Sequence, residues 1–591
     1  MTNQEIAKIL REMAIFYEMD NVLFKPRAYE RAAHGVEGLA EEAKDIYKKD
    51  GAKALAEIPG VGKGIAEHLE NLFKTGHFSE YDRLKKKNPV DITGLTAVEG
   101  VGPKMVKILY KELGIRNLEQ LEKAARQGKI RKLTHFGEKS AQKILKGIEF
   151  LKKSGGRRVL GFVLPEIRNL EKMIQAFPEV ERVTVAGSVR RRKETIDDID
   201  ILAVSAKPER VMERFLALPF IAHVYGHGST KTMVKLKNGL DADLRVVPQE
   251  SWGAALNYFT GSKFHNIALR EIAIKMRLKL NEYGLFRDKK FIAGKTEEEL
   301  YKALGLRYIE PEMREMAGEI EAARLSLRSD LGAVKVGPRL PNLIGYGDLC
   351  GDLQTQTNWT DGENSIEEMA HAAMDAGLEY IAITDHTRSL AMTGGSDEKK
   401  LLKQMDAIDK VNKKLMGIPR AKSRGFRILK GAEVNIGKDG SLDIKDEVLA
   451  KLDVVGAAVH SHFNLPRLEQ MKRLIRAMEN PHVDIVFHLT GRVINKRAPI
   501  DIDIDEIIKT VKRTGTILEI DAFPDRLDIK DEYIKKCVER GVKMSIDSDA
   551  HSIKHFSVLE FGIAQARRGW ATQDDIINAW PAEKMLGFLK K

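Results

Sequence analysis

Three aspartates, Asp198, Asp200 and Asp243, have the residue type and spacing needed to bind divalent cations. Asp198 and Asp200 lie two positions apart, so on a strand both side chains project from the same face. Their apolar flanks predict a core strand, where unpaired carboxylates are costly, although DDID alone could be an exposed acidic turn. The segment DADLRVV predicts a second strand that carries Asp243, and the run ERVTVAGSV at 181–189 predicts another strand that continues through Gly187. Three carboxylates around two cations about 3.5–4 Å apart are typical of in-line phosphoryl transfer.

The pentapeptide GSVRR, which begins at Gly187, precedes this pair, with Ser188 ten residues before Asp198. A glycine turn, the Ser188 hydroxyl and the Arg191 guanidinium could hold a triphosphate. One cation would then activate a 3′-hydroxyl while the other neutralises the departing pyrophosphate. Hard oxygen ligands favour Mg²⁺, with Mn²⁺ as the alternative. The same combination occurs in nucleotidyltransferases generally, including enzymes that modify tRNA ends or drugs.

Two glycine-rich segments form an imperfect repeat, IPGVGKGIAEHL at 58–69 and VEGVGPKMVKIL at 98–109. Each predicts a hairpin between two helices that leaves backbone N–H groups for a phosphate, although a single one could be an ordinary turn. The segment 133–145 is a candidate third copy. Such contacts would position the protein on DNA without reading its sequence. The glycines assigned to DNA binding are Gly60, Gly62, Gly64, Gly100 and Gly102.

The segment YFTGS at 258–262 is followed by Asn266 and Arg270. Read alone, it is a helix end with an aromatic pair in the core. Together with GSVRR, the aspartates and the hairpins, it resembles the family X DNA polymerases, to which DNA polymerase beta belongs. The resemblance covers residues 1 to about 317.

That resemblance implies roles around an incoming nucleotide. Tyr258 and Phe259 would line the sugar pocket and disfavour a 2′-hydroxyl, with Gly261 beside them. Asn266 would contact the minor-groove edge of the incoming base, and Arg270 would contact the template strand.

The resemblance also implies contacts in the helical region. Lys25 and Tyr29 match positions at which relatives bind a downstream 5′-phosphate, and Lys104 in the second hairpin is assigned to DNA binding with them. The family's hairpins hold a monovalent cation through backbone carbonyls. The matching residues here are Thr96, Val98 and Val101.

Three positions depart from the family pattern. His68 stands where the family has its lyase lysine, so deoxyribose-phosphate lyase activity by that route is not expected. Asp197 replaces a glycine beside the triphosphate, and Asp241 adds an acid near Asp243. Either acid could alter the affinity for metal or nucleotide.

From residue 346 onward, strand-like runs alternate with helical stretches, which predicts a parallel sheet or barrel with functional groups at the carboxyl ends of the strands. This segment resembles the polymerase and histidinol phosphatase (PHP) domain. Imidazoles and carboxylates together suit Mn²⁺ or Zn²⁺. The matching candidate ligands are Asp361, His386, Glu433, His460, His488, Asp549 and His551.

The first motif of that family, D-L-H-x-H-T, is altered to Asp352-Leu353-Gln354-Thr355-Gln356-Thr357. A neutral amide lacks the basic lone pair of imidazole and is a poor ligand for transition metals. Gln354 and Gln356 should therefore weaken at least one metal of the family's trinuclear cluster. Relatives with an intact cluster act as 3′–5′ exonucleases or phosphoesterases, so we expect that activity to be reduced or lost here.

The chain of 591 residues is too long for one core and predicts several domains. We expect a helix-hairpin-helix N-terminal region, an α+β polymerase beta-like nucleotidyltransferase palm, a helical or mixed nucleotide-selection subdomain and a C-terminal α/β PHP barrel. The predicted bounds are 1–90 and 91–155 for the two hairpin domains, 156–250 for the palm, 251–317 for nucleotide selection, 318–345 for a linker and 346–591 for the PHP domain.

Charge and cysteine content limit the possible binding partners and the cellular compartment. Residues 1–160 carry 31 Lys and Arg against 22 Asp and Glu, which indicates a polyanion partner, although a solvated lysine-rich surface fits the charge equally well. Cys350 and Cys537 stand far apart, which argues against a disulfide scaffold and fits a reducing cytosol. The amphipathic N-terminus predicts neither a signal peptide nor a membrane span.

The leading hypothesis is a gap-filling repair polymerase that binds gapped or primer-template DNA and dNTPs as a monomer, without a membrane partner, in the cytoplasm at the nucleoid. A second hypothesis is a PHP phosphoesterase that uses its front half only to hold DNA. Gln354 and Gln356 argue against it. A non-catalytic DNA scaffold would explain the hairpins but not the three aspartates.

Overall fold

The computed structural model describes residues 3–37, 42–58, 60–98, 100–133, 136–153, 157–325, 339–390, 393–417 and 425–589. The chain forms two compact units, residues 1–156 with 493–498 and residues 157–492 with 499–591. Residues 326–338 of the predicted linker and residues 134–135 of the candidate third hairpin lie outside the described residues. The bounds of the individual domains stay predictions.

The first unit is helical over its N-terminal segment, as predicted. Apolar side chains from both hairpins, including Ile58, Val61, Val98 and Val101, pack in one core. The helices are α1 (Asn3–Met19), α2 (Lys25–Glu37), α3 (Ala43–Ala56), α4 (Lys63–Thr75), α5 (Ser79–Lys87), α6 (Ile92–Thr96), α7 (Pro103–Leu113), α8 (Leu118–Arg126) and α9 (Glu138–Lys153).

The first hairpin requires glycine at position 60. Gly60 has a φ of 77°, and a side-chain carbon there would lie 2.6 Å from the main-chain carbonyl carbon of Arg31. Gly62 and Gly102 adopt extended backbone immediately before α4 and α7. The first N–H groups of a helix have no partner within it, so the first turns of α4 and α7 have the geometry of an anion-binding site.

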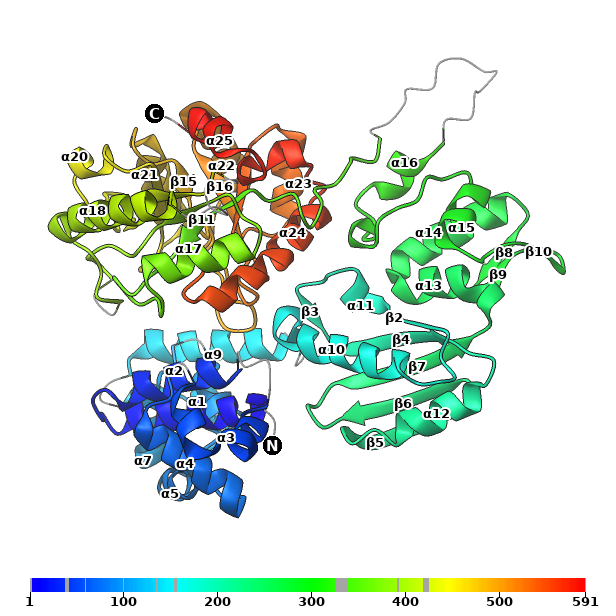
Figure 1. The fold of residues 1–591 in the computed structure, drawn as a ribbon, viewed down its shortest axis with the longest axis horizontal. Helices are drawn as coiled ribbons and strands as arrows, with labels where there is room; N and C mark the ends of the chain where they lie inside the picture. Colours follow the sequence, from blue (N-terminus) through cyan, green and yellow to red (C-terminus); the bar gives the residue numbers. More distant parts are fainter. Residues whose placement is uncertain are drawn as a thin grey trace. The chain divides into compact units, whose positions relative to one another are not determined.

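The palm is a five-stranded sheet in the order β2-β4-β7-β6-β5, in which only β4 and β7 pair in parallel. Two helices, α10 (Leu160–Gln175) and α12 (Pro208–Leu216), pack against it (Figure 1). The strands are β2 (Arg182–Val185), β4 (Asp198–Val204), β5 (Ile221–His227), β6 (Lys231–Leu236) and β7 (Asp241–Val247), and a separate two-stranded ribbon contains β1 (Arg158–Val159) and β3 (Thr195–Ile196).

One expected strand is shorter than the sequence suggested. The run ERVTVAGSV ends as a strand at Val185, and Gly187–Arg190 forms the helical turn α11. Gly187 has a φ of 59°, which a strand cannot contain.

The segment after the palm mixes helices with a three-stranded antiparallel sheet of order β10-β9-β8. It agrees with the helical or mixed subdomain that was predicted. Its elements are α13 (Trp252–Thr260), α14 (Lys263–Lys275), β8 (Lys279–Asn281), β9 (Gly284–Arg287), β10 (Lys290–Ala293), α15 (Glu297–Ala303) and α16 (Glu319–Ala323).

The C-terminal segment is a nearly closed barrel of seven parallel strands in the order β11 to β17, as predicted. Thr355 bridges to Ala550, which brings the first strand beside the last. The strands are β11 (Gly351–Thr355), β12 (Tyr380–Ile383), β13 (Arg427–Asn435), β14 (Val454–Ala458), β15 (Ile485–Val486), β16 (Ile517–Asp521) and β17 (Met544–Asp547).

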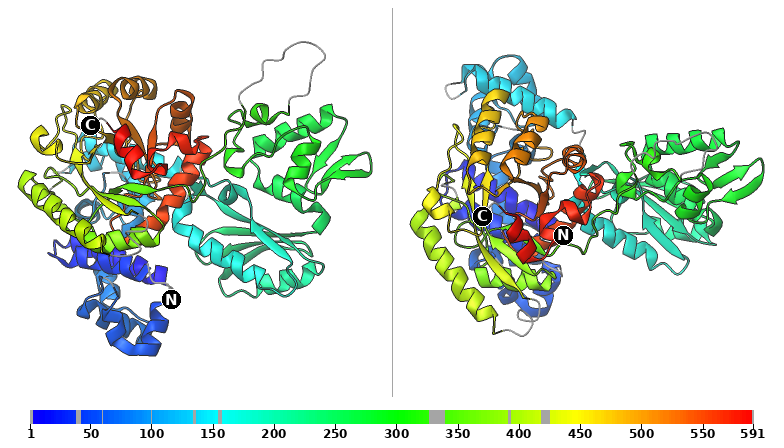
Figure 2. Two further views of the ribbon diagram at one scale, coloured as in Figure 1. Left: turned by 45° about the horizontal axis from the view of Figure 1, so that its top comes forward. Right: turned by 90° about the horizontal axis from the view of Figure 1, so that it is seen from above.

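Helices surround this barrel in both views of Figure 2. They shield the apolar outer face of the strands, as a parallel sheet requires. The helices are α17 (Ile366–Asp375), α18 (Glu398–Leu415), α20 (Asp446–Leu449), α21 (Arg467–Glu479), α22 (Ile504–Thr514), α23 (Asp531–Glu539), α24 (Leu559–Arg568) and α25 (Ala582–Phe588).

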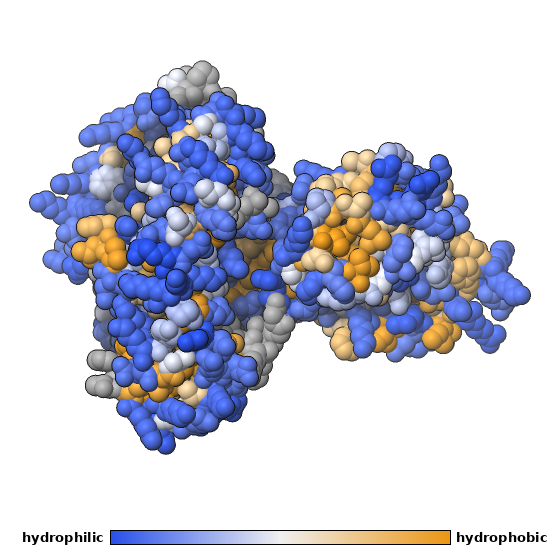
Figure 3. Space-filling model, turned by 90° about the horizontal axis from the view of Figure 1, so that it is seen from below, coloured by the Kyte–Doolittle hydropathy of each residue, from blue (hydrophilic) through white to orange (hydrophobic). Residues whose placement is uncertain are grey.

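The face drawn in Figure 3 is mainly hydrophilic, with apolar side chains gathered in separate areas. Across the described ranges, no helix is long and apolar enough to cross a membrane.

A buried ion network joins the palm to α15. Glu297 accepts hydrogen bonds from Arg190 at 2.6 and 3.0 Å and from Arg314 at 2.6 Å. Arg314 is fully buried and also donates to the Ile309 carbonyl. Although burial opposes it, the two guanidinium groups lower the pKa of Glu297 to about 2. The network therefore holds Glu297 charged and fixes the start of α15.

Replacing Arg314 with methionine should destabilise the palm and the segment that contains α15, because Glu297 and the Ile309 carbonyl lose buried hydrogen-bond donors. Breaking one partner of a buried ion pair costs about 3–5 kcal/mol. Urea denaturation followed by tryptophan fluorescence measures the change. Arg287→Met, on an exposed residue of β9, should shift stability by only about 0.5 kcal/mol. Equal shifts for both variants would contradict the role of the network.

Candidate active sites

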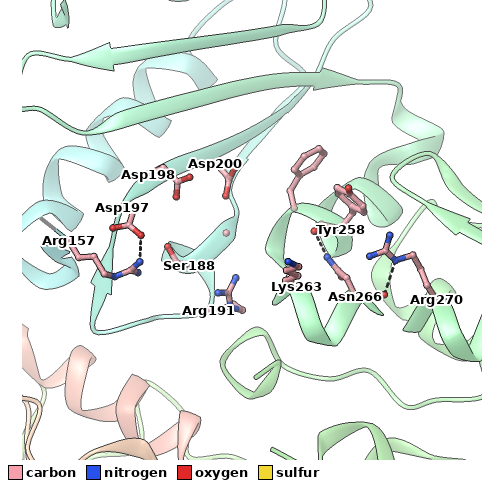
Figure 4. A pocket seen from close by; sticks show the side chains of 13 residues that line it. Arg157, Ser188, Arg191, Asp197, Asp198, Asp200, Tyr258, Lys263, Asn266 and Arg270 are labelled. Carbon is pink, nitrogen blue, oxygen red and sulfur yellow. Dashed lines mark hydrogen bonds and ion pairs between the residues drawn. The ribbon is translucent and has the colours of Figure 1, made fainter. Parts of the chain in front are cut away.

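The palm places Asp198 and Asp200 side by side on β4, with both carboxylates directed into one pocket (Figure 4). β7 pairs with β4 in parallel so that Asp243 lies directly opposite Asp200. Asp243 and Asp200 together line a small adjoining cavity. The structure therefore brings the three predicted aspartates together.

The electrostatics of these carboxylates favour a bound cation. Burial, with further repulsion from Asp198 and Asp243, raises the pKa of Asp200 to about 7. Burial likewise raises the pKa of Asp198. The Lys231 ammonium lies 3.2 Å from Asp243 and supplies one positive charge. Carboxylate oxygens are hard donors and suit Mg²⁺ or Mn²⁺. The positive charge of such an ion would relieve the repulsion among the three carboxylates.

The opposite side of the pocket is basic. Ser188 of α11 and Arg191, which directly follows α11, line it, and Arg157 and Lys263 line it as well (Figure 4). Arg157 and Lys263 lie outside the recognised motifs, so the sequence did not indicate them. Four polar or cationic side chains facing the carboxylates can hold an anionic substrate.

Gly187 allows α11 to approach the strand closely. A side-chain carbon at this position would lie 2.2 Å from Oδ2 of Asp200. The left-handed backbone conformation and the close approach both require glycine here.

The two additional acids have local partners. Asp197 is paired with Arg157 at the rim of the pocket (Figure 4). Asp241 lies 3.1 Å from the Lys235 ammonium and accepts a 3.1 Å hydrogen bond from the Tyr225 hydroxyl. Their charges are thus partly neutralised within the palm.

The predicted nucleotide-selection residues line the same pocket from α13 and α14. The rings of Tyr258 and Phe259 meet edge to face at 5.1 Å, just before Gly261. The Asn266 amide donates to the Tyr258 carbonyl at 2.7 Å, and Arg270 donates to the Asn266 carbonyl at 3.2 Å (Figure 4). The first contact ties α13 to α14 beside the carboxylates, and the second lies within α14.

The first hairpin contributes to a separate pocket in the first unit. Lys25 and Tyr29 of α2 line it, with Tyr29 largely buried. His68 also lines it and packs on Phe78, with ring centroids 5.6 Å apart. Burial lowers the pKa of His68. Gly60, Gly62 and Gly64 of the first hairpin also line this pocket.

In the second hairpin, Thr96 ends α6 and Gly102 precedes α7. The Val98 carbonyl accepts a 2.9 Å hydrogen bond from the Val101 N–H group, and Gly100 between them has a φ of 87°. Lys104 lies exposed in the first turn of α7. The hairpin thus has the tight turn that the repeat predicted.

In the barrel, Glu433 is central to the predicted metal ligands. Its carboxylate lies 2.8 Å from His488 Nε2, 2.9 Å from His460 Nε2 and 3.3 Å from His386 Nδ1. Asn435, which the motifs did not reveal, lies 2.7 Å from His460 Nδ1 and orients that ring. Such support from a neighbouring polar side chain is typical of histidine metal ligands.

A second cluster shares His386. Asp361 Oδ2 lies 3.8 Å from Nε2 of both His386 and His551. Arg526, which also lies outside the recognised motifs, is 3.6 Å from Asp549 and 3.6 Å from Asp521. The seven predicted ligands thus converge at one end of the barrel, and this mixed donor set fits Mn²⁺ or Zn²⁺.

Gln354 and Gln356 are fully buried beside these ligands. Neither polar atom of the Gln354 amide has a hydrogen-bond partner among the described residues. The Gln356 amide donates to Glu433 at 2.9 Å. This amide N–H is a donor and therefore cannot itself bind a cation.

Comparison with known proteins finds matches to parts of the chain and to its full length. Family models match as DNA polymerase beta thumb at residues 255–315, helix-hairpin-helix domain at 1–78 and SAM-like helix-hairpin-helix tandem at 92–149. The DNA polymerase/3′-5′ exonuclease PolX of Bacillus subtilis (strain 168) is 36% identical over 597 residues, covering 100% of both chains.

Two phosphatases are similar to the C-terminal part. A probable phosphatase of Thermoanaerobacter sp. (strain X514) is 29% identical over 225 residues, covering 36% of this chain and 84% of its own. A probable phosphatase of Acetivibrio thermocellus is 31% identical over 196 residues, covering 32% of this chain and 73% of its own.

Replacing Gly187 with alanine should disable the palm site, because the new methyl group would displace the Asp200 carboxylate. Displacing a catalytic group by about 1 Å can cost on the order of 100-fold in rate. Primer extension measures this loss. Gly239→Ala is the matched control, since Gly239 also has a positive φ, 89°, but its side-chain carbon would meet only Arg158. Similar losses in both variants would mean that backbone strain alone is responsible.

Proposed function

Because this chain belongs to the DNA polymerase/3′–5′ exonuclease PolX family of family X polymerases, we propose that it fills short gaps in DNA during repair, such as base excision repair. The observation that carries the proposal is a single pocket. Asp198 and Asp200 line one side, and Ser188, Arg191 and Tyr258 line the other.

In this proposal, Asp198, Asp200 and Asp243 hold two divalent cations, Mg²⁺ or Mn²⁺. Cations held there would activate the primer 3′-hydroxyl and neutralise the leaving pyrophosphate. Gly187 allows the close approach that brings Asp200 against α11.

The basic side of the pocket binds the triphosphate of a dNTP. Ser188 and Arg191 donate hydrogen bonds to it, and Arg157 and Lys263 add positive charge. Arg157 must give up part of its contact with Asp197 to do so. These interactions orient the α-phosphate for in-line attack, which is the main contribution a protein makes to phosphoryl transfer.

Residues from α13 and α14 select the nucleotide and the template. Tyr258 and Phe259, beside Gly261, restrict the space next to the sugar and disfavour a 2′-hydroxyl. Asn266 contacts the incoming base, and Arg270 contacts the template strand. Their shared pocket with the carboxylates supports these assignments.

The first unit is proposed to hold gapped or primer-template DNA by its backbone. Gly60, Gly62, Gly64, Gly100 and Gly102 shape hairpins whose N–H groups bind phosphates, and Lys104 adds charge at the second one. The carbonyls of Thr96, Val98 and Val101 are assigned to a monovalent cation. Lys25 and Tyr29 are assigned to a downstream 5′-phosphate, and their common pocket with the first hairpin supports this.

The chain is proposed to act as a monomer. The proposed DNA substrate places its action at the nucleoid.

The barrel is proposed as a weakened exonuclease site. Asp361, His386, Glu433, His460, His488, Asp549 and His551 would hold Mn²⁺ or Zn²⁺. Gln354 and Gln356 supply amides where the family pattern has imidazoles. The cluster should therefore bind fewer ions, or bind them less tightly, than the family's trinuclear site.

Asp243→Ala should reduce primer extension on gapped DNA at least tenfold, because the metal site loses a ligand, while DNA affinity remains. Extension in Mg²⁺ and DNA binding by fluorescence anisotropy measure the two effects. Asp241→Ala is the matched control on the same strand, and its extension should stay within about threefold, since removing a paired, exposed charge has small effects. Extension by Asp243→Ala above a tenth of the wild-type rate would contradict the assignment.

Replacing both Gln354 and Gln356 with histidine should increase Mn²⁺-dependent 3′–5′ degradation of single-stranded DNA. Since loss of supporting contacts alone costs about 10–100-fold, the gain should reach at least about tenfold. Primer extension should not change. His460→Ala in the same background should remove the gained activity. If the unmodified chain already degrades DNA rapidly and the double variant adds nothing, the glutamines do not limit the site.

A further inference from the structure

A buried arginine of the barrel contacts the main chain of Arg191, a residue that lines the polymerase pocket. Arg568, the last residue of α24, has a side chain that is only 3% exposed. One terminal nitrogen, Nη1, donates to the main-chain carbonyl of Arg191 at 3.1 Å and to Glu315 at 3.4 Å. The other, Nη2, donates to Asp531 at the start of α23. One guanidinium group therefore connects two barrel helices to the triphosphate-binding segment.

Glu315 lies between two arginines. The same oxygen, Oε1, that accepts from Arg568 also accepts a 2.8 Å hydrogen bond from Nε of Arg191. Arg191 donates in addition to the Thr260 carbonyl and lines the pocket (Figure 4). Lys193 lies 3.8 Å from the same carboxylate oxygen. Although burial opposes it, the surrounding positive charge of Lys193, Arg568 and Arg191 lowers the pKa of Glu315.

This arrangement affects how strongly Arg191 can bind an anion. A carboxylate bonded to Arg191 competes with a triphosphate for the same guanidinium group. Arg568 takes part of the hydrogen-bonding capacity of Glu315 and, through the Arg191 carbonyl, also fixes the main chain from which Arg191 extends. Both effects keep Arg191 available in the pocket.

We propose that Arg568 of the C-terminal barrel is a positioning residue for the incoming nucleotide, acting on Arg191 through Glu315 and the main chain. The proposal rests on the proposed function, in which Arg191 binds the triphosphate. It makes the barrel a structural part of the polymerase site, independent of any nuclease activity that the barrel has.

A second contact between barrel and palm provides the control. Arg492 is 5% exposed and donates to Glu194 at 2.5 and 3.2 Å. Glu194 is not among the residues that line the pocket. Arg492 thus matches Arg568 in residue type, burial and location but bonds to a palm residue outside the pocket.

The test is single-nucleotide insertion into gapped DNA by the full chain in Mg²⁺. Arg568→Gln should raise the KM for dNTP about fivefold or more with kcat within about twofold, because a contact made equally before and during the chemical step affects KM alone. Arg568→Lys, which keeps the charge, should give an intermediate KM. Arg492→Gln should leave KM within about twofold of wild type. Thermal melting confirms that each variant is folded.

A double-mutant cycle distinguishes an effect on the position of Arg191 from a general destabilisation of the contacts between barrel and palm. In a Glu315→Gln background no carboxylate remains to compete for Arg191, so Arg568→Gln should raise KM by a smaller factor than it does in the wild type. Equal factors in the two backgrounds would overturn the proposal. So would a wild-type KM in folded Arg568→Gln and Arg568→Lys, or an equal rise in Arg492→Gln. Failure of the wild type to insert any nucleotide would instead overturn the proposed function itself.

Discussion

Mutual repulsion among Asp198, Asp200 and Asp243 is the constraint on which the polymerase half depends. Parallel pairing of β4 with β7 places Asp243 opposite Asp200, and the two-residue spacing places Asp198 beside it. Burial and this repulsion raise the pKa of Asp200 to about 7. A folded protein keeps such a cluster when bound cations offset the repulsion. The basic side chains across the pocket are consistent with this, because the proposed substrate that binds together with the cations is anionic.

The two catalytic centres differ in the chemistry of their donors. The palm offers carboxylate oxygens, which suit Mg²⁺, whereas the barrel surrounds Glu433 with imidazoles, which suit transition metals. This difference allows the two sites to use different ions in one chain. The amides of Gln354 and Gln356 change the donor set of the barrel site alone. The hydrogen bond from Arg568 to the Arg191 carbonyl shows that the barrel also has a structural connection to the palm.

Much of this organisation could be predicted from the sequence, because local rules govern it. Alternation of apolar and polar residues predicted the strands that carry Asp200 and Asp243, and strand ends predicted where His386 and His460 lie. The strand expected to continue through Gly187 ended early, since a positive φ at glycine cannot be read from an apolar pattern. Contacts between distant segments, such as Glu315 with Arg191 or Asn435 with His460, were not predictable because a single sequence carries no information about which segments meet.

Asp198, Asp200 and Asp243 are proposed to hold two cations for nucleotide insertion. Crystals of the chain with gapped DNA and a non-hydrolysable dNTP analogue, grown in Mn²⁺, would test it by anomalous scattering. Two peaks should lie about 3.5–4 Å apart between Asp198 and Asp200, with Asp243 contacting one of them and the triphosphate contacting Ser188 and Arg191. A nucleotide bound with no Mn²⁺ at these carboxylates, or with ions only in the barrel, would contradict it.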